Sequence, residues 1–383
     1  MTRGTGRGGH AAAPRSVDVA RLAGVSQKTV SRVFNDEPYV STEVRRRVLE
    51  AAEELGYRRN DAARALASGR SRSIGVVTLG TALYGPVSLL MGVERAVRDT
   101  GYALRVVNTV EGDPAGIAGA VDSLLDQGVD GIVVSEPIDE SGGEGRGEGE
   151  IALRADVPVL VLGAPSPVTA PTVLTAGGGA GLMARTATEH LLDLGHMTVH
   201  HLAGPQRWYA ARDRLEGWRA TLTAHDREVP PVVEGDWSAA SGHRAGRALA
   251  EDPGVTAVFA ANDDMAIGLI RALLEAGRRV PEDVSVVGFD DTPVAAFVTP
   301  PLTTVPQPFD AVAREGLKRL VHAIEHPGAA PLPSSDPPVG LVVRASTAPP
   351  RAPGPGSALT GRRRPRGRSG PAGGASVPST TAS

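Results

Sequence analysis

The sequence predicts a small all-α helix-turn-helix headpiece followed by a large α/β core of two Rossmann-like lobes, each built on a parallel sheet. Three short helical periodicities follow one another within residues 16–57. From residue 74 onward, short β-branched runs alternate with amphipathic segments in two series, 74–162 and 179–289. Because strand–helix alternation favours parallel strands joined by right-handed crossovers, each series predicts one α/β lobe.

The net charge of −3 on this chain of 383 residues is divided unevenly. Residues 1–73 hold 14 basic and 8 acidic side chains, residues 74–350 hold 20 and 35, and residues 351–383 hold 6 and none. A basic end on an acidic body suits a polyanionic partner that binds at that end. Chance asymmetry on solvated faces is the other explanation of the same counts.

Composition excludes several classes of protein and site. The chain has no cysteine, which rules out disulfides, thiolate catalysis and cysteine-based zinc sites and is consistent with a cytoplasmic location. No stretch approaches the roughly 20 apolar residues of a membrane helix, and the N-terminus lacks the apolar run of a secretory signal. We therefore expect no membrane partner.

The headpiece is expected to span residues 16–57, after an arm at residues 1–15 whose composition predicts disorder. Gly24 permits the positive φ of a tight turn, and Ser26 can cap the second helix, 27–34. Ser41 can cap a third helix that runs from Thr42 to Leu55. The apolar stripes of the three helices are Val17, Val19, Ala20 and Ala23, then Val30, Val33 and Phe34, then Val44, Val48, Ala51, Ala52 and Leu55.

The core is expected to span residues 74–347. It follows a basic, Ala-rich hinge linker at 58–73 and precedes an Arg-, Pro- and Gly-rich tail at 348–383 that should be disordered. The acidic, Gly-rich loop 139–150 should be mobile. The expected strands are 74–78, 103–108, 131–135, 157–162, 198–203, 232–235, 255–260, 284–289 and 339–344. The expected helices are 87–100, 115–127, 150–155, 179–194, 209–225, 240–251, 263–276 and 309–325.

The strongest motif is DVARLAGVSQKTVSRVFN, from Asp18 to Asn35. Two short helices joined by a tight turn that contains glycine form a helix-turn-helix, whose second helix fits the major groove of DNA. Its N-terminal part carries side chains that can bond bases or phosphates, while its valines face inward. A three-helix interaction domain would explain the apolar stripe but not this polar set. The polar set is Gln27, Lys28, Ser31 and Arg32.

With this motif, and with VSTEVRRRV and LGYRRN after it, the chain resembles the LacI/GalR family of transcriptional regulators as far as about Thr347. The resemblance implies a core like periplasmic binding proteins and a repressor whose operator binding is controlled by a small effector. It implies that Gln27, Lys28 and Arg32 read bases, with Arg32 suited to a bidentate contact with guanine. The remaining implied DNA-contacting or helix-supporting residues of the headpiece are Ser26, Thr29, Ser31, Asn35, Ser41, Tyr57 and Asn60.

The segment from Asn60 to Ala67 matches the family's hinge, which folds into a helix on operator binding. The resemblance places Ala63 and Leu66 in the minor groove, with Leu66 as the wedge that kinks the duplex. Packing of Leu66 on the core is the alternative. The chain departs from the family at Arg15 and Ser16, where a Thr cap and an Ile or Leu are usual, and this predicts a less firmly anchored first helix.

The family also supplies candidate walls for an effector pocket between the lobes, at the carboxyl ends of strands. An arginine, an amide, a carboxylate and aromatic faces suit a sugar better than a nucleobase. The other reading makes Trp237 plain core, Asp263 a helix N-cap and Asp290 a turn residue. Gly163 stands where a family member has an acidic residue near its sugar, which leaves the identity of the sugar open. The candidate pocket residues are Leu83, Tyr84, Pro86, Arg214, Trp237, Asn262, Asp290, Gln307 and Phe309.

Other signals are weak. The run Gly177 to Gly181 lacks G-x-G-x-x-G spacing and more simply opens a helix. His196, His200 and His201 have no acidic partner at ligand spacing, so neither a metal nor a cofactor is expected. No catalytic residues are identified. The tail lacks the leucine heptads with which a family member builds tetramers, which favours a homodimer. A transport solute-binding protein and a sugar-modifying enzyme remain as alternative functions of such a core.

Overall fold

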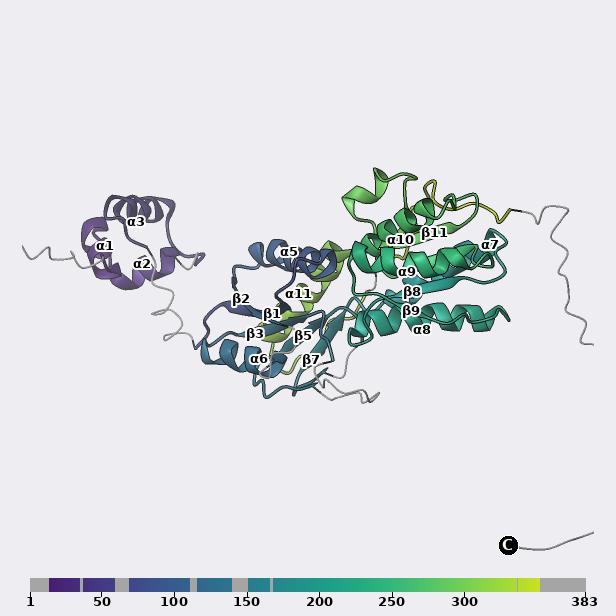
Figure 1. Ribbon diagram of the computed structural model, residues 1–383. Helices are drawn as coiled ribbons and strands as arrows, with labels where there is room; N and C mark the ends of the chain where they lie inside the picture. The colour runs from purple at the N-terminus through teal and green to yellow at the C-terminus, as the bar shows by residue number, and fades with distance from the viewer. Residues whose placement is uncertain are drawn as a thin grey trace, which may run out of the picture.

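The computed structural model describes residues 14–34, 37–58, 69–110, 116–139, 151–165, 168–335 and 337–351. They form a three-helix headpiece and two α/β lobes (Figure 1). We call the lobe that carries β1 the N-lobe and the lobe that carries β8 the C-lobe. The fold class predicted from the sequence is therefore confirmed.

The headpiece consists of α1 (Ser16–Ala23), α2 (Gln27–Phe34) and α3 (Thr42–Glu54) around a small apolar core. Gly24 ends α1 in the left-handed conformation, with φ +64°, and so lets the chain turn sharply into α2. Val17 was expected in the core but is exposed. The buried residues are Val19, Ala20, Ala23, Val30, Val33, Val48, Ala51 and Ala52.

The start of α1 is better anchored than its sequence suggested. The Asp18 carboxylate accepts a hydrogen bond from the Arg15 backbone N–H at 2.9 Å, which satisfies one of the free donors at the helix N-terminus. The Ser16 hydroxyl accepts a second bond from the Gln27 amide at 2.8 Å and ties α1 to α2. The predicted weakness at Arg15 and Ser16 was therefore wrong, because Asp18 and Gln27 compensate for the missing Thr cap.

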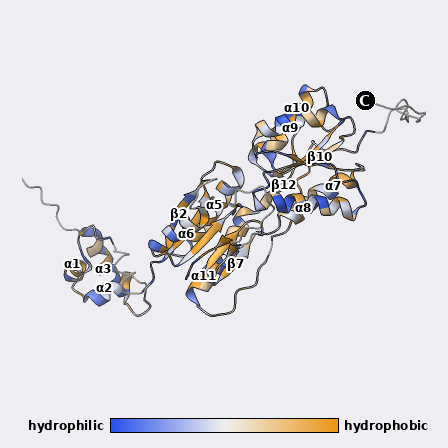
Figure 2. Cartoon of the chain, turned by 60° about the horizontal axis from the view of Figure 1, so that its bottom comes forward, coloured by the Kyte–Doolittle hydropathy of each residue, from blue (hydrophilic) through white to orange (hydrophobic). Residues whose placement is uncertain are grey.

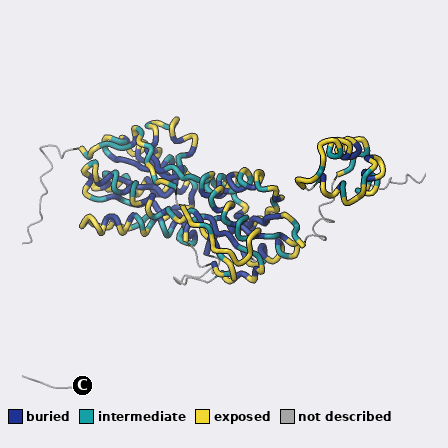
Figure 3. Tube along the Cα trace, turned by 180° about the vertical axis from the view of Figure 1, so that it is seen from behind, coloured by how far each residue is buried: buried dark blue, intermediate teal, exposed yellow. Residues whose placement is uncertain are grey.

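The N-lobe sheet is parallel throughout, in the order β2-β1-β3-β5-β7. The strands β1, β3 and β5 are buried along their whole length and contribute to an apolar core on each face, whereas the edge strand β2 is largely exposed. Figure 2 colours the chain by hydropathy and Figure 3 by burial. Helix α6 (Gly116–Asp126) covers one face, and α5 (Tyr84–Arg98) and α11 (Phe309–Glu325) cover the other. The strands are β1 (Ser73–Leu79), β2 (Ala103–Thr109), β3 (Gly131–Ser135), β5 (Val159–Leu162) and β7 (Val173–Ala176).

The C-lobe repeats this plan with the parallel order β12-β11-β10-β8-β9. Helices α7 (Ala180–Asp193) and α8 (Tyr209–Ala224) pack on one face, and α9 (Ala239–Glu251) and α10 (Asp263–Glu275) pack on the other. The strands are β8 (His200–Ala203), β9 (Val233–Glu234), β10 (Ala257–Ala260), β11 (Ser285–Asp290) and β12 (Thr303–Pro306), with a 3-10 turn η1 (Pro293–Ala296) after β11.

Helix α11 crosses back from the C-lobe to the N-lobe. It follows β12 in the sequence, yet Leu317, Leu320 and Ile324 are buried against the N-lobe sheet, and Figure 1 shows this late helix among the early strands. After α11 the chain returns to the C-lobe, where Val342 forms a bridge with Thr304. Each lobe is therefore assembled from segments that are distant in the sequence.

Several predicted elements of the core were wrong. The helix expected at 150–155 is a two-residue strand, β4 (Ile151–Ala152), which pairs with β6 (Val168–Thr169). The strand expected at 339–344 contributes only the single bridge at Val342. The sequence pattern also missed β6, β7 and β12, because strands of two to four residues carry too few positions to show a period. The glycine run at 177–181 opens α7, as predicted.

His201 is fully buried in the C-lobe between the rings of Trp218 and Phe259, with ring centroids 5.3 and 4.8 Å away. Its Nδ1 bonds the carbonyl of Phe259 at 2.9 Å. Burial lowers the pKa of His201 to about 4. The unfolded chain takes up this proton near pH 6.5 and the folded chain only near pH 4, so stability is lost as the pH falls through that interval.

We expect acidification to remove up to about 3 kcal/mol of stability through His201. Asp263 and Asp290, whose pKa values burial raises to about 6 and about 7, act in the opposite direction. The measurement is therefore a comparison of urea unfolding between pH 7 and 4 in the wild type and in His201→Asn, whose amide can still donate to Phe259. The variant should show a shallower acid loss, and equal slopes in the two proteins would contradict this assignment.

Candidate functional site

Helix α2 presents a polar face to solvent. Gln27, Lys28, Ser31 and Arg32 are exposed, while Val30 and Val33 are buried against α1 and α3. Arg32 forms an ion pair with Glu37 at 3.4 Å, with both side chains 46% exposed. Exposed ion pairs of this kind contribute little to stability, so Arg32 can leave Glu37 for another acceptor.

The other predicted residues of the headpiece hold α2 and α3 in place. Ser26 accepts the Thr29 backbone N–H at 3.1 Å, and the two hydroxyls are 2.9 Å apart, which caps the N-terminus of α2. Ser41 caps α3 by accepting from the Val44 N–H at 3.4 Å. Tyr57 is half-buried and packs on Phe34, with ring centroids 5.5 Å apart. The predicted residues Asn35, Asn60, Ala63 and Leu66 lie outside the described residues.

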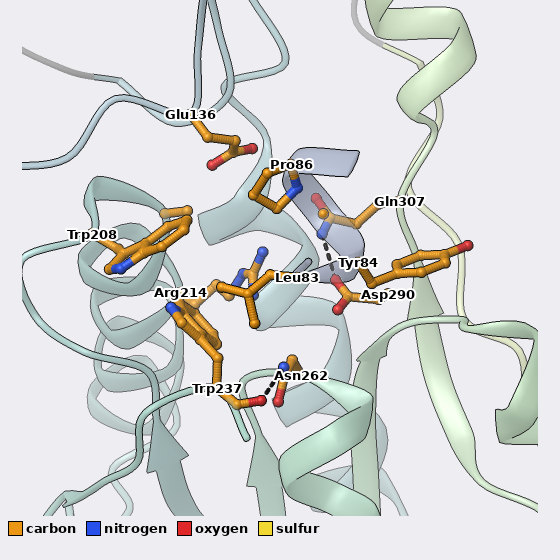
Figure 4. A pocket seen from close by; sticks show the side chains of 12 residues that line it. Leu83, Tyr84, Pro86, Glu136, Trp208, Arg214, Trp237, Asn262, Asp290 and Gln307 are labelled. Atoms are coloured by element: carbon orange, nitrogen blue, oxygen red, sulfur yellow. Dashed lines mark hydrogen bonds between the residues drawn. The ribbon is translucent and has the colours of Figure 1, made fainter. Parts of the chain in front are cut away.

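A pocket lies between the two lobes at the carboxyl ends of their strands (Figure 4). Its N-lobe wall follows β1 and β3, and its C-lobe wall follows β8, β9, β10, β11 and β12. Eight of the nine predicted pocket residues line it. The lining residues are Leu83, Tyr84, Gly85, Pro86, Glu136, Trp208, Ala210, Arg214, Trp237, Asn262, Asp290 and Gln307.

Phe309 is the predicted residue that does not line the pocket. It begins α11 and packs edge-on against Tyr84, with ring centroids 6.1 Å apart. The sequence reasoning missed Glu136, Trp208 and Ala210. Trp208 precedes α8 and packs edge-on against Trp237, with centroids 5.7 Å apart; its proximity to the predicted Trp237 was not visible in the linear chain.

Arg214 is the buried cation of the pocket. Its guanidinium donates to the Ala261 carbonyl and lies 3.9 Å from the Phe289 ring centroid and 5.4 Å from that of Trp237. Burial lowers the pKa of Arg214, and the neighbouring Asp290 and Glu136 carboxylates oppose that shift. Its Nε is buried without a hydrogen-bond partner. A buried donor without a partner is costly, so a ligand acceptor at this point would be strongly favoured.

Asp290 ends β11 and faces the same space. Its Oδ1 accepts from the Gln307 amide at 2.5 Å. Burial raises the pKa of Asp290 to about 7, against the attraction of Arg214. Asn262 is fixed differently, because its amide donates to the Trp237 carbonyl and its oxygen accepts the Met265 N–H, both at 2.9 Å.

Asn262 is thus the N-cap of α10, and the alternative that gave this role to Asp263 was wrong. Asp263 is buried and accepts from the Thr292 N–H at 2.7 Å and from the Thr304 hydroxyl at 2.6 Å. It joins the loops after β10 and β11 to β12. Asp263 therefore ties Thr292 and Thr304 together and does not line the pocket.

Backbone strain is concentrated around the pocket. Glu136, Trp237 and Asp290 have φ values of +50°, +70° and +117°, a region that residues other than glycine rarely adopt. Gly163, with φ +109°, lies beside Glu136. Strained residues persist where the surrounding structure fixes them, and they gather at functional sites. The three residues with these strained φ values, Glu136, Trp237 and Asp290, all line the pocket.

The Trp237 ring packs closely against the backbone at Gly204. A Cβ at Gly204 would lie 2.2 Å from the end of the Trp237 ring, so only glycine at this position leaves room for the indole. The Trp237 Nε1 is buried without a hydrogen-bond partner. Trp237 therefore offers an apolar face and an unused donor together, which is a combination suited to a polyol.

The two lobes also touch beside the pocket. The Asp139 N–H donates to the Arg207 carbonyl at 2.7 Å, and the Arg212 guanidinium donates to the Asp139 carboxylate at 2.7 Å. Ile138 and Trp208 form an antiparallel bridge at the same place. The relative position of the lobes is thus coupled to residues adjacent to the pocket lining.

Comparison with known proteins decides the family. Residues 17–60 match the model for bacterial regulatory proteins of the lacI family, and residues 188–347 match that for a periplasmic binding protein-like domain. The chain is 35% identical to the lactose operon repressor of Escherichia coli (strain K12) over 336 residues, which cover 86% of this chain and 89% of that repressor. The chain belongs to the lacI family.

Further lacI-family proteins agree with this assignment. The ribose operon repressor of Escherichia coli (strain K12) is 35% identical over 313 residues, covering 81% of this chain and 93% of that protein. Among solved structures, the lac repressor dimer bound to operator and the anti-inducer ONPF has a TM-score of 0.73 at 33% identity, covering 88% of this chain and 99% of that one. These relatives are transcriptional regulators.

Two further findings concern the described ranges alone. No helix in them combines the length and apolar character that crossing a bilayer requires. Nor do they bring three or more histidine or acidic side chains together as a metal site would.

Proposed function

We propose that this lacI-family regulator is a repressor that binds an operator through α2 and that a small sugar in the pocket between the lobes controls this binding. It acts in the cytoplasm, where the DNA lies, and performs no chemistry on the sugar. Two features of this one chain carry the proposal. The headpiece, which matches the lacI-family model, exposes a polar helix face, and residues of both lobes line a polar pocket.

The headpiece supports the DNA side of this proposal. The exposed face of α2 carries the base-reading candidates Gln27, Lys28 and Arg32, and its N-terminus has no acidic residue in the first turn. Ser26 and Ser41 cap the helices, and we propose that they and Thr29 contact phosphates of the operator. In such modules phosphate contacts set the position and base contacts set the sequence.

The pocket supports the control by a sugar. Because its walls come from both lobes, a ligand that contacts both walls changes the relative stability of lobe arrangements. The N-lobe receives the chain from the headpiece just before β1, where the Asp130 carboxylate accepts the Ser71 and Arg72 N–H groups at 3.0 and 2.7 Å. A movement of the N-lobe is thereby passed to the linker, and the sugar releases the DNA.

We propose a homodimer as the working form. The resemblance to the lac repressor dimer on its operator supports two headpieces acting on a near-palindromic site. A transport solute-binding protein would share the core, but the DNA-binding headpiece argues against that function. The pocket residues do not form an arrangement that supports an enzyme.

The test is binding of the full chain to a labelled duplex taken from the DNA upstream of its own gene. We expect a complex with a dissociation constant of about 10⁻⁸ M or tighter at moderate salt, weakening steeply as salt rises. A shuffled duplex of the same composition is the control. Equal affinity for the two duplexes would refute a repressor that recognises a specific operator.

A further inference from the structure

Glu136 is the one charged pocket residue that neither the motifs nor the resemblance indicated. It follows β3 directly and lines the pocket from the N-lobe, opposite the C-lobe residues Arg214 and Trp237. Figure 4 shows its carboxylate directed into the pocket, between Trp208 and Pro86 in that view. Its strained φ of +50° fixes this direction.

The Glu136 carboxylate occupies the space that a side chain at position 163 would need. A Cβ built on Gly163 would lie 3.0 Å from Glu136 Oε1, closer than such atoms normally approach. Gly163 is also the position at which a family member has an acidic residue near its sugar, so this chain departs from that relative here. The two positions compete for one volume, and in this chain the volume holds the carboxylate of Glu136.

This carboxylate is available for a ligand. Across the described ranges, no hydrogen-bond donor reaches it, although it is buried enough to raise the pKa of Glu136. Arg214 influences it through charge alone. Glu136 is half-buried, so its carboxylate is partly removed from water and still accessible to a ligand, whose hydroxyl group could donate to it.

The balance of charge limits what the ligand can be. Two carboxylates, of Glu136 and Asp290, face the pocket together with one guanidinium, of Arg214. Burial raises the pKa of both carboxyl groups, that of Asp290 to about 7, so together they carry less than two negative charges near neutral pH. The negative charge that remains opposes the attraction of Arg214 for a phosphate or carboxylate on the ligand. Hydroxyl groups suit both kinds of pocket group, because a hydroxyl can donate to a carboxylate and accept from an N–H group. The N–H groups available are Arg214 Nε and Trp237 Nε1, which are buried without hydrogen-bond partners.

We infer that Glu136 is a specificity-determining residue, which supplies from β3 the carboxylate that Gly163 lacks and restricts the effector to an uncharged sugar. The inference rests on the proposed function, since it names the ligand class of the same pocket. It assigns to Glu136 one hydrogen bond from a sugar hydroxyl on the N-lobe side and the exclusion of phosphorylated sugars.

The experiment compares four full-length proteins: the wild type, Glu136→Gln, Gly163→Ala and the control Glu251→Gln, whose side chain is exposed on α9. Thermal unfolding is followed with ribose, galactose, lactose, cellobiose and maltose, and with ribose 5-phosphate and glucose 6-phosphate. We expect at least one uncharged sugar, and neither phosphate, to raise the unfolding midpoint of the wild type, as a ligand of the folded state does.

Affinities for that sugar are then measured by calorimetry. Glu136→Gln should bind it at least ten-fold more weakly, because it keeps the shape but loses the charge that strengthens the bond. Gly163→Ala should also weaken it while keeping the charge, because its methyl group crowds the Glu136 carboxylate and its φ of +109° strains the backbone beside it. Glu251→Gln should match the wild type. Unfolding midpoints without sugar show whether each variant is folded.

Three results would overturn the inference: wild-type affinity in Glu136→Gln, stabilisation by a sugar phosphate as large as that by any uncharged sugar, or no stabilisation by any of the five uncharged sugars. Failure of the proposed function gives a different result. In that case the wild type would not distinguish the upstream duplex from the shuffled one, whatever the sugars do.

Discussion

Replacing Arg32 with alanine is expected to lower the affinity for the upstream duplex about five- to 150-fold for each headpiece engaged and to reduce discrimination against the shuffled duplex. The range is the free energy of about 1–3 kcal/mol that one bidentate arginine–guanine contact contributes to base discrimination. Arg32 is exposed on α2 and, among the described residues, its side chain is held by an exposed ion pair with Glu37 and takes no part in the headpiece core, so its removal leaves that core unchanged.

The matched control is Arg46→Ala on α3. Arg46 is also an exposed headpiece arginine, and it forms ion pairs with Glu43 and Glu50 at 2.7 and 2.8 Å. Both variants remove one positive charge, but only Arg32 lies on the polar face of α2. Fluorescence anisotropy with both duplexes separates the two effects. Equal discrimination in Arg32→Ala and the wild type, with the variant folded, would rule out α2 as the reading helix.

The second large effect is expected for Gly268→Ala, which should destabilise the C-lobe by about 3 kcal/mol or more. Helices α9 and α10 cross in backbone contact: a Cβ on Gly268 would lie 1.9 Å from the Ala239 carbonyl oxygen, and one on Gly242 would lie 2.1 Å from that of Met265. No rotamer change can relieve a collision with backbone, so the helices must separate and the well-packed interface is lost.

The sign of this effect distinguishes the collision from helix propensity. Alanine in place of glycine inside a free helix would stabilise it by about 1 kcal/mol. Gly340→Ala is the control, because a Cβ there would meet nothing within 4 Å and should change stability by no more than about 0.5 kcal/mol. Urea unfolding measures both. A Gly268→Ala protein as stable as the wild type would show that the helices do not touch at this point.

The headpiece was largely predictable because its information is local. The spacing of apolar residues, the Gly24 turn and the caps at Ser26 and Ser41 lie within a few residues of the features they determine. The exception is the start of α1, where Gln27, from the next helix, supplies the anchoring bond. That bond joins residues 11 positions apart, and no local pattern reveals it.

The pocket depended on resemblance, because its residues are scattered from Leu83 to Gln307 and meet only in the folded chain. Glu136 could not be found in this way. Its role depends on a strained φ and on the absence of a side chain at Gly163, and neither is a property of the residue itself. The one indication in the sequence was Gly163. It stands where a family member has a carboxylate, which suggests that another acidic residue nearby could take that place.

The crossing of α11 sets the order in which the molecule can be completed during synthesis. A ribosome that has released the chain as far as β7 has delivered every strand of the first sheet, but one face still lacks the cover that Val312, Leu317 and Leu320 provide. That face remains open until more than a hundred further residues have emerged, including the whole second sheet. Helix α5 alone then covers this face, so a nascent chain stalled before Phe309 should bind chaperones through the part that α11 leaves uncovered, whereas one stalled after Glu325 should not.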